Sequence, residues 1–221
     1  MTGPACIVLA GGLGTRLGSV LGGLPKCLAP VAGRPFLALQ LDALAAAGVG
    51  RFVLSLGHGA DAVLAVLPEL RARHAVEAVV EHERLGTGGA MLFALDRIGL
   101  DECLVTNGDT FLEGSLAAML PPLDRAAGER LRVATVEVPD RGRFGGLAVA
   151  GGRVRSFVEK GSSAPGPINA GLYRVSREAF GDRAPGTAFS FEQDVMPGLV
   201  AAGAVGAADT GGGFIDIGVP E

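Results

Sequence analysis

Short apolar runs alternate with longer helical patterns through the first half of this 221-residue chain. Alternation of this kind predicts right-handed β-α-β units and a largely parallel sheet. We therefore expect an α/β fold, a three-layer sandwich with a mixed, mainly parallel central sheet. The expected strands are 6–10, 51–57, 75–81 and 102–109, and the expected helices are 36–48, 60–73, 87–98 and a segment near 113–120.

The second half of the chain is richer in strand patterns than in helices. The Gly151-Gly152 pair separates two alternating runs and is a two-residue hairpin signal. Because no linker, repeat or low-complexity tract interrupts the chain, we expect one domain over residues 1–221, whose halves meet near residue 120. The expected strands are 131–138, a hairpin within 146–160, 168–175 and 214–218, and the expected helix is 190–203.

Composition argues against several kinds of partner. The formal net charge is −4 and no block of lysine and arginine stands out, so we expect no nucleic-acid partner. The three cysteines form no C-x-x-C pair, which argues against a disulfide scaffold or a zinc site. We see no signal-peptide pattern and no apolar run near the ~18 residues that span a bilayer. A cytoplasmic protein without a membrane partner is the expectation, and a homodimer is left open.

The first predicted strand runs into a glycine-rich turn that contains Gly11, Gly12 and Gly14. Glycine lacks the Cβ that would hold the backbone away from an anion, and it permits positive φ where a loop must curl. Glycine content alone would favour an ordinary strand–loop–helix corner. Two cations that follow, Arg16 and Lys26, instead favour a loop whose amides face a polyphosphate clamped by both side chains.

Two better-known glycine loops do not fit this segment. The P-loop pattern is a glycine, four residues of any type and then Gly-Lys-Ser/Thr, and no such string is present. The dinucleotide fingerprint needs a third glycine where this chain has Leu17. The segment instead resembles the signature of the sugar-1-phosphate nucleotidylyltransferases, which is G-x-G-T-R followed after a gap by P-K. The matching residues are Gly12, Gly14, Thr15, Arg16, Pro25 and Lys26.

The resemblance extends over nearly the whole chain in seven ordered motifs. It implies a Rossmann-like nucleotide-diphospho-sugar transferase fold, with a nucleotide-binding half over about 1–120 and a sugar-binding half over about 121–221. Ser19-Val20 and Cys27 depart from the commonest pattern and argue against the dTDP-glucose and UDP-glucose branches. As a set, the motifs resemble most the D-glycero-α-D-manno-heptose 1-phosphate guanylyltransferases. The later motifs are GTGGA, NGDTF, EK, N-x-G-x-Y, FSFEQD and FIDIGVPE.

Two aspartates follow or end predicted strands, Asp109 and Asp216. Taken alone, either could be a helix cap or a turn residue. Magnesium prefers one or two carboxylates together with phosphate oxygens and water. The resemblance implies that both aspartates hold Mg²⁺, and that Arg16, Lys26 and Asp109 are the catalytic residues of an in-line displacement. An ionised sugar phosphate needs no general base.

The resemblance also implies which residues bind the substrates, a nucleoside triphosphate and a sugar 1-phosphate. An EK pair at a strand end could equally be an exposed charged pair, and FSFEQD could be the start of a helix capped by Ser190. The nucleotide-binding candidates are Leu9, Gly11, Gly12, Gly14, Thr15, Glu81, Gly86 and Thr87. The sugar-phosphate candidates are Asn107, Gly146, Glu159, Lys160 and Asn169.

The nucleotide base is suggested by a glutamate ahead of the GTGGA motif. A carboxylate accepts hydrogen bonds, which suits the two donor groups of guanine better than the single donor of uracil or thymine. This favours GTP and leaves the choice between Glu81 and Glu83 open. Three other interpretations also stay open. They are a uridylyltransferase for a sugar such as N-acetylmuramate 1-phosphate, a non-catalytic regulatory subunit, and a molybdenum-cofactor or phosphocholine-type transferase.

Overall fold

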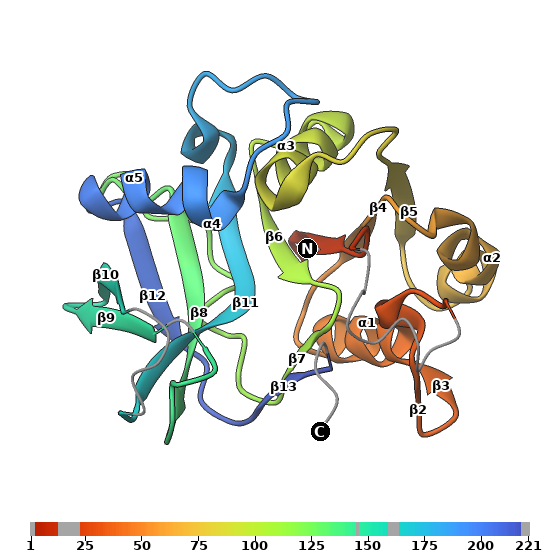
Figure 1. Cartoon of the computed structure of the whole chain (residues 1–221), viewed down its shortest axis with the longest axis horizontal. Helices are drawn as coiled ribbons and strands as arrows, with labels where there is room; N and C mark the ends of the chain where they lie inside the picture. Colours follow the sequence, from red (N-terminus) through yellow and green to blue (C-terminus); the bar gives the residue numbers. More distant parts are fainter. Residues whose placement is uncertain (1–2, 13–22, 145, 159–163, 218–221) are drawn as a thin grey trace.

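The computed structural model of the chain describes residues 3–12, 23–144, 146–158 and 164–217 (Figure 1). The helices are α1 (Phe36–Ala46), α2 (Ala60–Arg71), α3 (Gly86–Ile98), α4 (Phe191–Asp194) and α5 (Met196–Ala201), with the short 3-10 helices η1 (Lys26–Leu28) and η2 (Arg177–Phe180). The strands of the first half are β1 (Ala5–Leu9), β2 (Pro30–Val31), β3 (Arg34–Pro35), β4 (Arg51–Leu56), β5 (Val76–Val80), β6 (Glu102–Asn107) and β7 (Thr110–Leu112). Those of the second half are β8 (Leu131–Val138), β9 (Gly146–Ala150), β10 (Arg153–Val158), β11 (Gly166–Ser176), β12 (Val205–Asp209) and β13 (Phe214–Asp216).

The described residues form a nine-stranded central sheet in the order β5-β4-β1-β6-β11-β8-β12-β10-β9. Strands β5, β4, β1 and β6 are parallel to one another, and β12 is parallel to β8. Strands β11 and β10 run against their neighbours. The sheet is therefore mixed with most strands pointing one way, as the alternation of the first half predicts.

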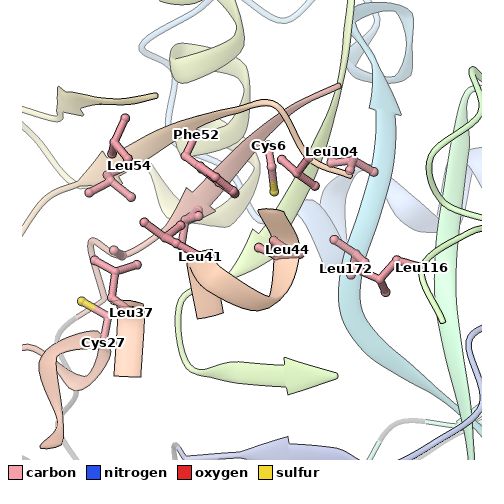
Figure 2. Close-up of a cluster of buried hydrophobic side chains, with 14 of the residues drawn as sticks. Cys6, Cys27, Leu37, Leu41, Leu44, Phe52, Leu54, Leu104, Leu116 and Leu172 are labelled. Carbon is pink, nitrogen blue, oxygen red and sulfur yellow. The ribbon is translucent and has the colours of Figure 1, made fainter. Parts of the chain in front are cut away.

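Helices cover both faces of this sheet, which confirms the three-layer α/β architecture. Helices α1 and α2 pack on one face, and α3, α4 and α5 pack on the other (Figure 1). The alternation along β1 explains the two layers, since Cys6 and Val8 enter the core on the α1 side and Ile7 enters the opposite core. Figure 2 shows Leu41 and Leu44 of α1 among the side chains of the first core. This packing holds α1 firmly against the strands that carry the site.

The helix predicted near residues 113–120 is wrong. Strand β7 ends at Leu112, and the chain then continues through bends and turns because its backbone pairs with a distant segment. The Ser115 amide donates to the Thr210 carbonyl at 2.8 Å. A Cβ on Gly114 would lie 2.1 Å from that same carbonyl oxygen, so only glycine allows the two chains to cross so closely. Local periodicity does not reveal such a contact.

The helix predicted over 190–203 is divided into α4 and α5. Its start is capped, since the Gln193 amide donates to the Ser190 hydroxyl at 3.2 Å. The division falls at Val195, whose φ of −118° lies far from the helical mean of about −63°. Pro197 follows, and it lacks the N–H that a continuous helix would need.

Strand β12 is a central strand that the sequence pattern does not predict. Gly206, Ala207 and Ala208 are poor strand formers. The structure favours a glycine at 206, since a Cβ there would lie 2.0 Å from an oxygen of Glu129, a carboxylate bound by Arg132. Parallel pairing with β8 then orders the segment.

A further prediction is confirmed in the second half of the chain. The predicted hairpin forms at Gly151-Gly152, where both residues have positive φ and join β9 to β10. No helix among the described residues has both the length and the apolar character needed to cross a bilayer.

Candidate active site

The carboxyl ends of β1, β4 and β6 approach one another closely because glycine follows each strand. A Cβ on Gly11 would lie 2.8 Å from the Gly57 nitrogen, and a Cβ on Gly108 would lie 2.7 Å from the Leu9 carbonyl oxygen. The Gly108 amide donates to that carbonyl at 3.0 Å. The turns after the three strands therefore lie side by side at one edge of the sheet, where ligands of open α/β sheets bind.

A cleft of about 770 Å³ opens over these strand ends. Its size is typical of sites that enclose a small molecule. It collects side chains from segments far apart in the chain, and both signs of charge are present. The predicted site residues that line it are Leu9, Gly11, Gly12, Lys26, Glu81, Gly86, Thr87, Asn107 and Asp109.

Other predicted site residues lie elsewhere. Gly146, Asn169 and Asp216 are described but are not among the residues that line this cleft. Asn169 instead donates from its side chain to the Tyr173 hydroxyl at 2.9 Å and accepts from the Gly171 amide at 3.0 Å. The positions of Gly14, Thr15, Arg16, Glu159 and Lys160 lie outside the described residues.

The two catalytic candidates Lys26 and Asp109 form an ion pair. The Lys26 Nζ lies 3.6 Å from Oδ2 of Asp109, and the two side chains are 20% and 34% exposed. Lys26 opens η1 directly after Pro25, and Asp109 lies in the turn between β6 and β7. Residues separated by most of the first half of the chain thus meet in the cleft.

Asp216 is brought to Asp109 by a small second sheet. Strands β13 and β7 pair antiparallel with Asp216 opposite Thr110, and the Ile217 amide donates to the Asp109 carbonyl at 3.0 Å. Burial raises the pKa of Asp109, the Asp216 carboxylate raises it further, and Lys26 lowers it. The charge state of Asp109 therefore depends on both the Asp216 carboxylate and the Lys26 cation.

The two carboxylates fit a divalent cation such as Mg²⁺ whose coordination is completed by substrate phosphate oxygens. Among the described residues no group of three or more His, Cys, Asp or Glu side chains could enclose a metal. Two mutually repelling carboxylates, Asp109 and Asp216, are what Mg²⁺ uses when phosphate oxygens and water fill its remaining positions. Both carboxylates would hold the ion.

Glu81, at the end of β5, is oriented by two hydrogen bonds. The Ser55 hydroxyl donates to one carboxylate oxygen and the Leu85 amide to the other, each at 3.3 Å. Burial raises the pKa of Glu81, and these two donors lower it. Glu83 also lines the cleft, but it is exposed. Of the two alternatives, Glu81 is the carboxylate whose direction the fold sets.

The GTGGA segment begins α3, as predicted, but two of its amides face protein. The amides of Gly88 and Gly89 donate to the Phe189 carbonyl at 3.1 and 3.3 Å. A Cβ on Gly88 would lie 2.4 Å from the Phe189 ring, so this glycine serves close packing. These two amides therefore bind protein and are not available to a nucleotide. Gly86 and Thr87 remain at the cleft.

Sequence reasoning missed several residues of the cleft, of which Glu192 is the most strongly held. Its carboxylate accepts from the Thr87 hydroxyl at 2.6 Å and from the Ser190 hydroxyl at 3.2 Å. The FSFEQD motif contained it, but its role as a wall of the cleft depends on α4 lying against the start of α3. His58 could have been found, since it follows directly after a predicted strand end.

The comparison with known proteins agrees with this geometry. A protein-family model described as nucleotidyl transferase matches residues 5–221. The chain belongs to the nucleotidyl transferase family. The resemblance of its motifs is thereby confirmed, and the chain is an enzyme of the nucleotidyltransferase class.

Named relatives share this family over nearly their whole length. The D-glycero-α-D-manno-heptose 1-phosphate guanylyltransferase of Aneurinibacillus thermoaerophilus is 31% identical, with 97% of this chain and 93% of the relative covered. That of Campylobacter jejuni is 32% identical, with 97% and 95% covered. The crystal structure of HddC from Yersinia pseudotuberculosis complexed with GMP-PN is similar with a TM-score of 0.84. It is 37% identical and covers 98% of this chain and 95% of its own.

Proposed function

We propose that this chain transfers a guanylyl group from GTP to D-glycero-α-D-manno-heptose 1-phosphate and releases pyrophosphate. The observation that carries the chemistry is the contact of Lys26 with Asp109 beside Asp216, over the strand ends of the cleft. The substrates are suggested by the names of the relatives that match along nearly the whole chain. Magnesium as the metal and the cytoplasm as the compartment belong to the same proposal.

The proposed reaction is a single in-line displacement. A phosphate oxygen of the sugar 1-phosphate forms a bond to the α-phosphorus of GTP, and the bond from that phosphorus to the bridging oxygen breaks, so that pyrophosphate leaves. The attacking phosphate is already ionised, so the chain needs no general base. The work of the protein is therefore to bring two anions together and to neutralise their charge.

Lys26 is the described cation best placed for this work. Its ammonium lies next to Asp109 in the lining of the cleft, where it can contact both the attacking phosphate and the α-phosphoryl group. Asp109 and Asp216 would hold Mg²⁺, which when bound supplies positive charge against the repulsion between the two phosphates. Arg16 with Gly14 and Thr15 would bind the outer phosphates, by the resemblance of their motif.

Recognition of the two organic groups is assigned to two different sets of residues. Glu81, held by Ser55 and Leu85, would accept hydrogen bonds from guanine, with Gly86 and Thr87 beside it. Glu83 is the alternative base contact. The sugar and its phosphate are assigned to Asn107, Gly146, Glu159, Lys160 and Asn169.

The test is a matrix of nucleoside triphosphates against sugar 1-phosphates, read as pyrophosphate release. The sugars include mannose 1-phosphate, because a mannose-1-phosphate guanylyltransferase of Mycobacterium tuberculosis is 35% identical over 89% of this chain, which spans 55% of that enzyme. We expect the highest kcat/KM with GTP and the heptose phosphate. Preference for UTP with N-acetylmuramate 1-phosphate would replace the proposal by a uridylyltransferase. Sugar-nucleotide binding without any transfer would replace it by a regulatory subunit.

A further inference from the structure

Gln40 is a polar residue in the apolar face of α1, and it is only 3% exposed. Its side-chain nitrogen donates to the Asn107 carbonyl at 2.8 Å and to the Thr110 carbonyl at 2.6 Å. These two carbonyls stand on either side of Gly108 and Asp109. A single amide group thus spans the turn that presents the candidate metal ligand.

The orientation of this amide follows from its neighbours. Both groups that face it are acceptors, so the NH₂ side must point at the turn. The Oε1 atom of Gln40 is then buried without a hydrogen-bond partner among the described residues. Leaving an acceptor in that state costs about 1–3 kcal/mol. An apolar side chain of the same length would avoid this cost, and what it would lack is the pair of donors to the turn.

The same turn is held on two other sides. The Gly108 amide donates to the Leu9 carbonyl of β1, and the Asp109 carbonyl accepts from the Ile217 amide just after β13. Gln40 holds the turn from α1, and the buried leucines of this helix fix it in the core (Figure 2). Removing Gln40 takes the side-chain donor from both carbonyls, leaving Asn107 the longer contact from the Thr106 hydroxyl at 3.4 Å, and lets the turn shift.

We propose that Gln40 is a positioning residue that holds the turn 107–110 so that the Asp109 carboxylate faces Asp216, and that it thereby sets the affinity of this pair for a divalent cation. The inference deepens the proposed function and rests on it for the part that concerns turnover. Gln40 is not among the residues that line the cleft, so it would act on the cation through the turn. Partners that orient metal ligands typically change metal affinity or activity by about 10–100-fold when removed.

The test compares Gln40→Met, which keeps the volume and loses both donors, with Leu41→Met on the same helix. Leu41 is fully buried and is a volume-conserving control in the same core. Mn²⁺ is titrated into the substrate-free protein and followed by the EPR signal of free Mn²⁺, with Asp109→Asn as the reference for a lost ligand. We expect binding weakened by about tenfold or more in Gln40→Met and unchanged in Leu41→Met.

Turnover provides a second readout. We expect Gln40→Met to lower kcat by about tenfold or more and to raise the Mg²⁺ concentration for half-maximal rate, while the KM for GTP stays within about threefold. Should Gln40→Met not fold, Gln40→Asn, one methylene too short to reach both carbonyls, takes its place with the same expectations.

The outcomes separate the two proposals. Wild-type Mn²⁺ binding and Mg²⁺ dependence in a folded Gln40 variant would overturn the role of Gln40, whatever the enzyme transfers. Equal weakening in Leu41→Met would overturn it too, because general loosening of α1 would then explain the effect. Weakened Mn²⁺ binding in a protein that transfers no guanylyl group would support Gln40 and refute the proposed function.

Discussion

Lys26→Ala separates the catalytic role of the Lys26–Asp109 pair from its contribution to stability. At 3.6 Å the gross attraction between the two charges is about 4–5 kcal/mol for an effective dielectric constant near 20. Both side chains are partly exposed, and desolvation and lost side-chain freedom offset most of this energy. The net contribution of such a pair to folding is about 1 kcal/mol or less. For a chain of this length we expect the melting temperature to fall by no more than about 2–4 °C.

The effect on catalysis should be much larger. A cation that meets charge developing between two phosphates is worth about 10²–10³ in kcat. We therefore expect Lys26→Ala to lose at least about 100-fold in pyrophosphate release while remaining folded. Lys26→Arg is the matched control, because it keeps the charge but spreads it over a planar group, and it should recover part of the rate.

The titration of Asp109 gives an independent check of the same reasoning. Lys26 lowers the pKa of Asp109, so its removal raises that pKa further. In the metal-free protein, followed by NMR, the pKa of the Asp109 carboxyl should therefore be higher in Lys26→Ala than in the wild type. A folded Lys26→Ala protein with near-normal turnover, or with an unshifted Asp109 pKa in the absence of metal, would refute the assignment.

Three further predictions concern single carboxylates. Asp109→Asn should abolish turnover yet raise the melting temperature at neutral pH. The reason is that the pKa of Asp109 is raised in the folded state, so its ionised carboxylate destabilises the fold at neutral pH. Calorimetry at several pH values measures this effect. Glu81→Gln should raise the KM for GTP about tenfold or more and affect UTP less, and the same pattern in Glu83→Gln alone would identify Glu83 as the base contact. Arg34 lowers the pKa of Asp42 to about 2, so the ionised Asp42 side chain should stabilise the fold fully above the usual pKa range of aspartate and lose that effect as the pH falls toward 2. Acid unfolding curves of Asp42→Asn should lack this pH-dependent contribution.

Much of the site could be predicted because many of its functional residues belong to short contiguous motifs. The glycines after β1, the Lys26 position and the NGD turn are contiguous strings whose geometry follows from strand ends and small residues. The alternation of strands and helices placed these strings at one edge of a parallel sheet. The roles of Arg16 and Lys160 in substrate binding remain predictions.

Other parts of the site could not be found because they depend on distant segments. Gln40 looks like an isolated polar residue on an apolar helix until the Asn107 and Thr110 carbonyls are seen beside it. Glu192 belongs to the cleft because Thr87 binds it across the chain. The segment near 113–120 forms no helix because it pairs with the segment around Thr210. That contact lies too far along the chain to be predicted from neighbouring residues.

The sequence by itself determined the class of fold and the class of chemistry, because periodicity and short glycine, lysine and aspartate motifs act over neighbouring residues. Only the tertiary structure decided which carboxylate meets which cation. Asp109 and Asp216 repel each other because β7 pairs with β13, and Lys26 offsets that repulsion because η1 lies against the same strand ends. Electrostatic interaction depends on distance in space, and chain folding alone sets that distance.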